Sequence, residues 1–238
     1  MFSSPRLMYT LPQRPIPGRG KEEVPTKTAL TTFAKEALAD FRTVGAVAPS
    51  SRFLASAMLG ALPLKKARTV VEVGPGTGVI TRALLERLPF DASLLAFEIN
   101  PRFSRHLKST VPDTRLSLIN TSAEKLHEEL NHRGIHHVDA VVSSLALGMM
   151  PAWQRRHFLC GVCSLLNEKG AFSQYQYIHS MQVMLNGHLK RFDLEKMLHR
   201  YFRSVHRKMI WRNLPPAFVF VCKNPRPFSA ELLEGDPC

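Results

Sequence analysis

The stretch TVVEVGPGTGVITR, from Thr69 to Arg82, decides how the rest of the chain is read. Its β-branched run up to Val73 predicts a strand buried on both faces of a parallel sheet. Glycines at 74, 76 and 78 then allow a sharp turn and a close backbone approach to a ligand, because no Cβ stands in the way. The spacing from Ile80 to Leu88 predicts a helix. Strand, glycine turn and helix in this order are typical of nucleotide-binding α/β units.

An acidic residue stands where such units hold a ribose. Glu98 ends the next apolar run, about 20 residues downstream, where a carboxylate can accept both ribose hydroxyls. The dinucleotide pattern G-x-G-x-x-G needs its third glycine at position 79, which is Val79, so NAD is disfavoured. The spacing E-x-G-x-G-x-G with this acid resembles the S-adenosylmethionine (SAM) site of class I methyltransferases. We therefore expect SAM to contact Glu72, Gly74, Gly76, Gly78 and Glu98.

The composition indicates an anionic partner. The 238 residues carry a formal net charge of +13 at pH 7, with 45% hydrophobic residues. This excess of positive charge favours nucleic acid or an anionic membrane surface. No apolar run is long enough for a membrane span, and four cysteines without a signal peptide favour a reducing compartment. We expect a cytoplasmic protein that associates peripherally with the cytoplasmic face of the membrane, and no metal site.

Four regions follow from the pattern along the chain. Residues 1–26 read as a disordered basic tail, 27–62 as a helical extension, 63–224 as the catalytic domain and 225–238 as a flexible tail. In the extension, an amphipathic helix from about Thr26 to Thr43 either packs over the core or lies among lipid headgroups. We also expect a third strand over Arg115–Ile119, a fourth from Val138, a helix over Pro151–Leu166, a fifth strand over Ala171–Tyr177, a basic helical stretch over Ile178–Tyr201, and strands over Arg203–Trp211 and Phe218–Cys222.

Three segments together resemble one enzyme family. These are GAVAPSSR at 45–52, VEVGPGTGVITRALL at 71–85 and RNLPPA at 212–217. They look like the bacterial phospholipid N-methyltransferases, which resemble the ribosomal RNA adenine dimethylases in overall pattern. The resemblance covers about Phe41 to Val221. It implies an α/β fold with a Rossmann-like sheet of seven strands and helices on both faces. It also implies SAM-dependent methylation of phosphatidylethanolamine towards phosphatidylcholine.

The chain departs from its relatives at two places. Related methyltransferases have an aspartate before Ala123 to accept a bond from the adenine amino group, whereas this chain has Ser122, whose hydroxyl can accept without a charge. The lipid enzymes have Ser-Gly-Leu-Pro-Leu after the fourth strand, and here Ser143 begins Ser-Ser-Leu-Ala-Leu. Adenine dimethylases instead place an Asn/Asp-Pro-Pro-aromatic motif there for a flipped base. The apolar run that follows suits a lipid better than a nucleobase.

Substrate contacts are expected at two strand ends. Ser143 matches the lipid family at the loop that faces the transferred methyl group, so we expect it near both cofactor and substrate. Tyr177 ends the fifth strand, where an aromatic face could stack on the substrate ammonium. Packing of Tyr177 against helices is the alternative.

Other functions remain open from sequence alone. The enzyme could methylate an ornithine lipid or another aminolipid. It could be an adenine dimethylase, which the basic charge allows and the loop at Ser143 disfavours. It could also be an inactive SAM-binding or membrane-binding protein, which the departures at Ser122 and Ala146 would suggest. The sequence does not indicate an oligomeric state.

Overall fold

The computed structural model describes residues 50–178, 182–185, 188–213 and 215–227. The predicted basic tail over 1–26, the amphipathic helix over Thr26–Thr43 and residues 228–238 lie outside this part of the chain.

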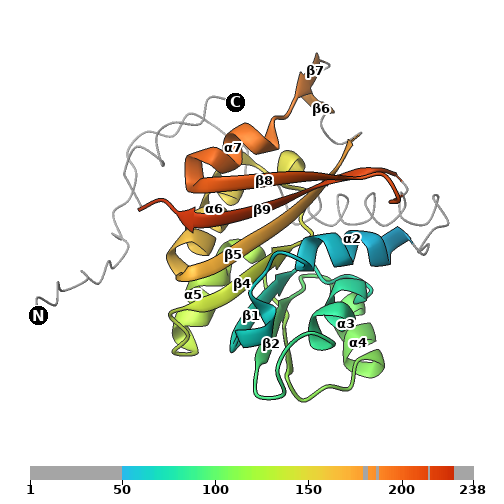
Figure 1. Cartoon of the computed structure of the whole chain (residues 1–238), viewed down its shortest axis with the longest axis vertical. Coiled ribbons are helices and arrows are strands. Elements are labelled where there is room, and N and C mark those ends of the chain that lie inside the picture. The colour runs from blue at the N-terminus through green and yellow to red at the C-terminus, as the bar shows by residue number, and fades with distance from the viewer. Residues whose placement is uncertain (1–49, 179–181, 186–187, 214, 228–238) are drawn as a thin grey trace, which may run out of the picture. The chain divides into compact units, whose positions relative to one another are not determined.

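A seven-stranded sheet in the order β3-β2-β1-β4-β5-β9-β8 forms the centre of the domain (Figure 1). Strands β1 to β5 are mutually parallel, and β9 is antiparallel to both of its neighbours, β5 and β8. Strands β1 to β5 and β8 therefore all end at one edge of the sheet, called the carboxyl edge below. The strand bounds are β1 Thr69–Val73, β2 Ser93–Phe97, β3 Leu116–Ile119, β4 Val138–Ser143, β5 Leu166–Tyr177, β8 Phe202–Ile210 and β9 Ala217–Pro225.

Helices cover both faces of this sheet because its strands are apolar on both sides. Val70 and Val71 are fully buried and point to opposite faces, as alternation along a strand requires. Helices α5, α6 and α7 cover the face of Val71, and α2, α3 and α4 cover the other. The helix bounds are α2 Ser50–Leu59, α3 Val79–Leu85, α4 Pro101–Thr110, α5 Leu126–His132, α6 Ala152–Leu165 and α7 Leu194–Tyr201. The predicted seven-stranded Rossmann-like fold is confirmed.

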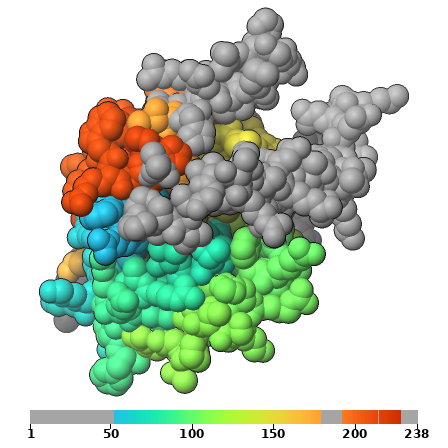
Figure 2. Space-filling model, turned by 90° about the vertical axis from the view of Figure 1, so that its right-hand side faces the viewer, coloured from blue at the N-terminus to red at the C-terminus, as the bar shows by residue number. Residues whose placement is uncertain are grey.

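Helix α2, near the start of the described chain, packs against the strands that come last in the sequence. It packs against β5, β8 and β9, with Leu54 and Met58 buried. In Figure 2 the blue surface of α2 adjoins the orange-red surface of β8 and β9. Residues far apart in the chain thus meet beside the end of β5.

The prediction of a helical stretch over Ile178–Tyr201 is wrong for its first half. Strands β6 Gln182–Leu185 and β7 His188–Arg191 pair antiparallel there, and among the described residues of this stretch the α-helix is α7. The missed signal is Asn186-Gly187, the dipeptide most typical of a two-residue hairpin turn, between two short runs.

Two element boundaries also differ from expectation. Strand β5 begins at Leu166, where a turn was expected over 167–170, and its register against β4 shifts between Val138 and Ala140. Helix α3 ends at Leu85, earlier than expected, a few residues before Pro89, which cannot continue a helix. In the part of the chain that the structure describes, none of the helices is both long enough and apolar enough to cross a membrane.

We predict that Gly78→Ala destabilises the fold more than Gly134→Ala. Both glycines have left-handed backbones, with φ of 84° and 69°, so both substitutions carry the same conformational strain. A Cβ on Gly78 would clash with Cδ2 of the buried Leu107, whereas one on Gly134 meets nothing within 4 Å. Urea unfolding should show an additional loss of about 1–3 kcal/mol for Gly78→Ala. Equal losses would contradict this packing role.

Candidate active site

The glycine turn sits at the carboxyl edge, where β1 ends. The amide of Gly74 donates to the carbonyl of Phe97 at 2.9 Å, which ties the turn to the end of β2. Gly74, Gly76 and Gly78 have φ of 73°, 55° and 84°, a region that favours glycine. A Cβ on Gly76 would meet nothing within 4 Å, so the backbone there lies open to a ligand. Gly78 instead packs against Leu107 of α4.

Glu98 fastens this turn from β2. Its carboxylate accepts hydrogen bonds from the amide of Gly76 at 3.1 Å and, through the other oxygen, from the amide of Asn100 at 2.8 Å. Burial raises the pKa of Glu98, while these two hydrogen bonds oppose the rise. Each carboxylate oxygen retains a lone pair beyond its one bond. The group can therefore hold the turn and still accept the two hydroxyls of a ribose.

Two asparagines near Glu98 were not predicted as site residues. The side chain of Asn100 caps α4 by accepting from the amide of Arg102 at 2.9 Å. Asn120, just after β3, donates its side-chain amide to the backbone carbonyl of Glu98 at 2.6 Å. Both fix the backbone on which the Glu98 carboxylate stands. An asparagine directly before a proline at a helix start is a capping signal that could have identified Asn100.

Ser122 lies beyond β3 at the same edge. It precedes the short helix η2, Ala123–Lys125, is half-buried, and its hydroxyl makes no capping hydrogen bond. A free hydroxyl fits the expected contact with the adenine amino group, which remains a prediction.

Glu72 is a buried carboxyl without a partner. Its side chain is fully buried in β1, and neither oxygen has a hydrogen-bond partner among the described residues. Its pKa is raised to about 8, mainly by burial and in smaller part by the nearby charge of Glu98. Thr81 lies near enough to lower this pKa somewhat, yet its hydroxyl is also unpartnered, so no full bond forms. An unsatisfied buried acid beside the open Gly76 backbone fits a cationic ligand group, and the ammonium of SAM is one.

Hydrogen bonds from buried groups hold the loop after β4 in place. Ser143 is fully buried, and its hydroxyl accepts from the amide of Leu145 at 3.3 Å. The amide of Ser144 donates to the carbonyl of Val73 at 2.9 Å, which joins the loop to the end of β1. Ser143 thus shapes its own loop, and a direct role in catalysis remains a prediction.

Gln174 supports the same loop from β5 and was not predicted as a site residue. Its side-chain amide donates to the carbonyl of Leu145 at 2.9 Å and to that of Tyr175 at 2.6 Å. It is fully buried, so these bonds fix the loop against the sheet. The sequence offers little signal for this role, because β5 carries several other polar residues.

Tyr177 ends β5 at the carboxyl edge. It is half-buried, and its ring lies edge-on to Tyr175 with centroids 5.2 Å apart. Both tyrosines pack on the α2 face of the sheet, as strand alternation predicts. The next amide, of Ile178, donates to the carbonyl of Pro216 at 3.1 Å, which joins this strand end to the RNLPPA segment.

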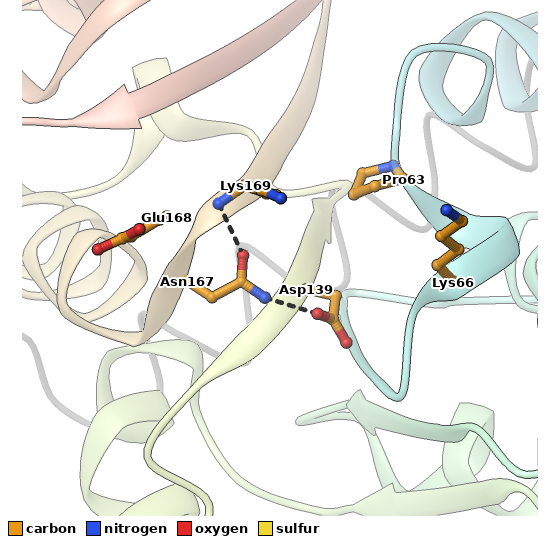
Figure 3. A pocket seen from close by; sticks show the side chains of 6 residues that line it. All are labelled: Pro63, Lys66, Asp139, Asn167, Glu168 and Lys169. Carbon is orange, nitrogen blue, oxygen red and sulfur yellow. Dashed lines mark hydrogen bonds between the residues drawn. The ribbon is translucent and has the colours of Figure 1, made fainter.

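A pocket lies at the other edge of the sheet, where β1, β4 and β5 begin, and its polar side chains serve to join these strands (Figure 3). Asp139 at the start of β4 accepts from the amides of Arg68 and Thr69 at 2.6 and 3.0 Å, and from the Asn167 side chain at 2.5 Å. These bonds join the starts of β1, β4 and β5. The pocket therefore lies away from the glycine turn.

The sheet order, the left-handed glycine turn and the acid after β2 that holds this turn are features of the fold of class I SAM-dependent methyltransferases. The comparisons agree. Residues 50–136 match the family model of ribosomal RNA adenine dimethylases. An ornithine lipid N-methyltransferase from Singulisphaera acidiphila is 29% identical over 181 residues, covering 76% of this chain and 88% of that one. The resemblance stated from the sequence is thus confirmed.

Solved structures show the same fold. The N-methyltransferase NodS from Bradyrhizobium japonicum has a TM-score of 0.61 at 15% identity, covering 76% of this chain and 99% of that one. The 1,6-didemethyltoxoflavin-N1-methyltransferase from Burkholderia thailandensis, solved with S-adenosylhomocysteine, also has a TM-score of 0.61, at 17% identity. That match covers 88% of this chain and 94% of the other.

We predict that Glu98→Gln weakens SAM binding about 10²-fold. The amide keeps the volume but loses the charge and one acceptor, and hydrogen bonds to a charged group contribute about 1.5–3 kcal/mol each. Isothermal titration calorimetry with SAM measures the change. Glu86→Gln on the exposed end of α3 is the matched control and should bind normally. Normal SAM binding by folded Glu98→Gln would remove Glu98 from the cofactor site.

We predict that Glu72 makes the ligand-free protein less stable as the pH rises from 4.5 to 8. Because the folded-state pKa is raised from 4.5 to about 8, the folded chain keeps a proton that the unfolded chain releases in this window. Glu72→Gln should remove this part of the decline, on the order of a few kcal/mol. Urea unfolding at pH 5 and pH 8.5 measures it, with Glu86→Gln as control. An unchanged pH dependence in Glu72→Gln would contradict the raised pKa.

Proposed function

We propose that this methyltransferase transfers the SAM methyl group to the primary amine of a membrane phospholipid headgroup, most directly phosphatidylethanolamine on the way to phosphatidylcholine. One observation carries the choice of a lipid over RNA. The match to adenine dimethylases ends at residue 136, before β4 and the loop that faces the methyl group. The match to a lipid enzyme spans 181 residues of a 238-residue chain, so it reaches beyond that point.

The residues around the β4 loop support an amine substrate. SAM supplies a methyl group on a sulfonium, and the amine nitrogen forms the new N–C bond as the S–C bond breaks. The nitrogen must first release its proton. The rim formed by Leu145 and Met149 lowers the amine pKa by desolvation, because a charged ammonium is disfavoured away from water. The aromatic face of Tyr177 holds the cationic forms present before and after transfer.

The surface of the carboxyl edge supports contact with a membrane. Among the described residues, four of the five exposed large hydrophobic side chains follow strand ends at this edge. They are Ile99, Met149, Trp153 and Trp211, and Phe90 is the exception. With a net charge of +13, this edge fits an anionic bilayer that presents the headgroup to the site. We propose peripheral association with the cytoplasmic face, to which the amphipathic segment before Thr43 would add.

A second candidate substrate is an ornithine lipid, because the Singulisphaera relative is an ornithine lipid N-methyltransferase. Both headgroups carry an amine beside an anionic group, so the described site residues suit either.

The test uses purified full-length protein, radiolabelled SAM and four substrates in parallel. These are liposomes of phosphatidylethanolamine, the same liposomes with anionic lipid, liposomes of ornithine lipid, and ribosomal RNA. We expect label in phosphatidylethanolamine, increased by anionic lipid, and none with Glu98→Gln. Label confined to ornithine lipid would select the second candidate. Label in RNA alone, or in no substrate, would reject a lipid methyltransferase.

A further inference from the structure

Two arginines from distant parts of the chain lie against one aromatic ring. The guanidinium carbon of Arg52, in the first turn of α2, lies 5.2 Å from the ring centroid of Phe53. That of Arg212, which follows β8, lies 4.1 Å from the same centroid. Both arginines are exposed, and both belong to segments that carry the resemblance to lipid enzymes. Two like charges near one ring repel each other, and an anion bound by both would relieve this repulsion.

No carboxylate neutralises this pair within the described part of the chain. Arg207 provides the contrast, because it also lies over a ring, that of Phe218 at 4.9 Å, but forms an ion pair with Glu195 at 2.7 Å. Arg52 and Arg212 have ring contacts without such an acid. Their donors are therefore available for an external oxyanion, which guanidinium groups bind in a bidentate way.

Hydrogen bonds of Asn213 fix the turn that carries Arg212. Asn213 is buried, and its side-chain amide donates to the carbonyl of Pro215 at 2.7 Å. Its backbone amide donates to the carbonyl of Ile210 at 3.4 Å. Two consecutive prolines further restrict this backbone. The turn thus fixes the base of the Arg212 side chain at the carboxyl edge.

The pair lies next to the expected methyl-acceptor position. Pro216, in the same turn, accepts from the amide that follows Tyr177. Phe53 and Tyr177 pack on the same face of the sheet, and Tyr177 and Ile210, two residues before Arg212, both pair with Ala217 of β9. Trp211 beside Arg212 is 72% exposed, and tryptophan favours the interface between lipid and water. The surface where α2 meets β8 and β9 is visible in Figure 2.

We infer that Arg52 and Arg212 bind the anionic group of the headgroup whose amine is methylated. The inference rests on the proposed function and adds the site that orients the substrate. The ligand chemistry is an oxyanion a few bonds from a primary amine, which is either a phosphodiester or a carboxylate. With the oxyanion on the two guanidiniums, the amine reaches towards Tyr177 and the β4 loop.

The experiment uses short-chain lipids below their micelle concentration, so that no bilayer contributes. The variants are Arg52→Gln, Arg212→Gln and Arg212→Lys. Arg203→Gln, which removes the same charge from an exposed position at the start of β8, is the matched control. Initial rates with dihexanoyl phosphatidylethanolamine and with a short-chain ornithine lipid give KM and kcat. Calorimetry gives SAM affinity, and thermal unfolding confirms that each variant is folded.

We expect each Gln variant to raise KM about 10-fold or more, with kcat and SAM affinity little changed and Arg203→Gln normal. Arg212→Lys should fall between the wild type and Arg212→Gln, because it keeps the charge and loses the planar fork. The lipid whose KM responds identifies the oxyanion as phosphodiester or carboxylate. Unchanged KM in folded Gln variants, or an equal rise in the control, would overturn the inference alone. A wild type that methylates neither lipid would overturn the proposed function with it.

Discussion

The hydrogen bonds from the amides of Gly76 and Asn100 to the carboxylate of Glu98 are the constraint on which the site depends. They close the glycine turn of β1 onto the end of β2, and so hold the left-handed backbone that its glycines allow. The buried carboxylate is stabilised by the same bonds, since desolvation alone would raise its pKa further. The acid that holds the turn is also the acid placed for a ribose. The same hydrogen bonds therefore shape the glycine turn and position the carboxylate that we expect to bind the cofactor.

The sequence predicted this arrangement well because its signals are local. A β-branched strand, alternate glycines and an acid after the next strand each reflect one backbone requirement at one place. The seven strands follow from equally local patterns, and all are present. The hairpin of β6 and β7 was missed because a basic, apolar stretch can satisfy helical spacing, while the Asn186-Gly187 signal occupies two residues.

Long-range partners could not be read from the sequence. No local sequence pattern indicates that Gln174 donates to the carbonyl of Leu145. Nor does any such pattern indicate that Arg212 lies over the ring of Phe53, beside Arg52. Sequence spacing placed Ser143 at the β4 loop, but its burial beneath that loop depends on the folded backbone. Likewise, Gly78 reads as a cofactor residue in the motif, whereas the fold shows its close approach to Leu107.

On the proposed function, the site divides into a cofactor half, on β1 to β3, and a substrate half, on the β4 loop, the end of β5 and the β8–β9 turn. The adenine dimethylase match covers the first half only, which explains how one chain resembles both RNA and lipid enzymes. A crystal structure of the full chain with S-adenosylhomocysteine tests this division most directly. The account predicts ribose hydroxyls on Glu98, the amino acid part over Gly76 and the adenine beside Ser122. A cofactor bound away from the Gly76 backbone, or a ribose without Glu98, would contradict it.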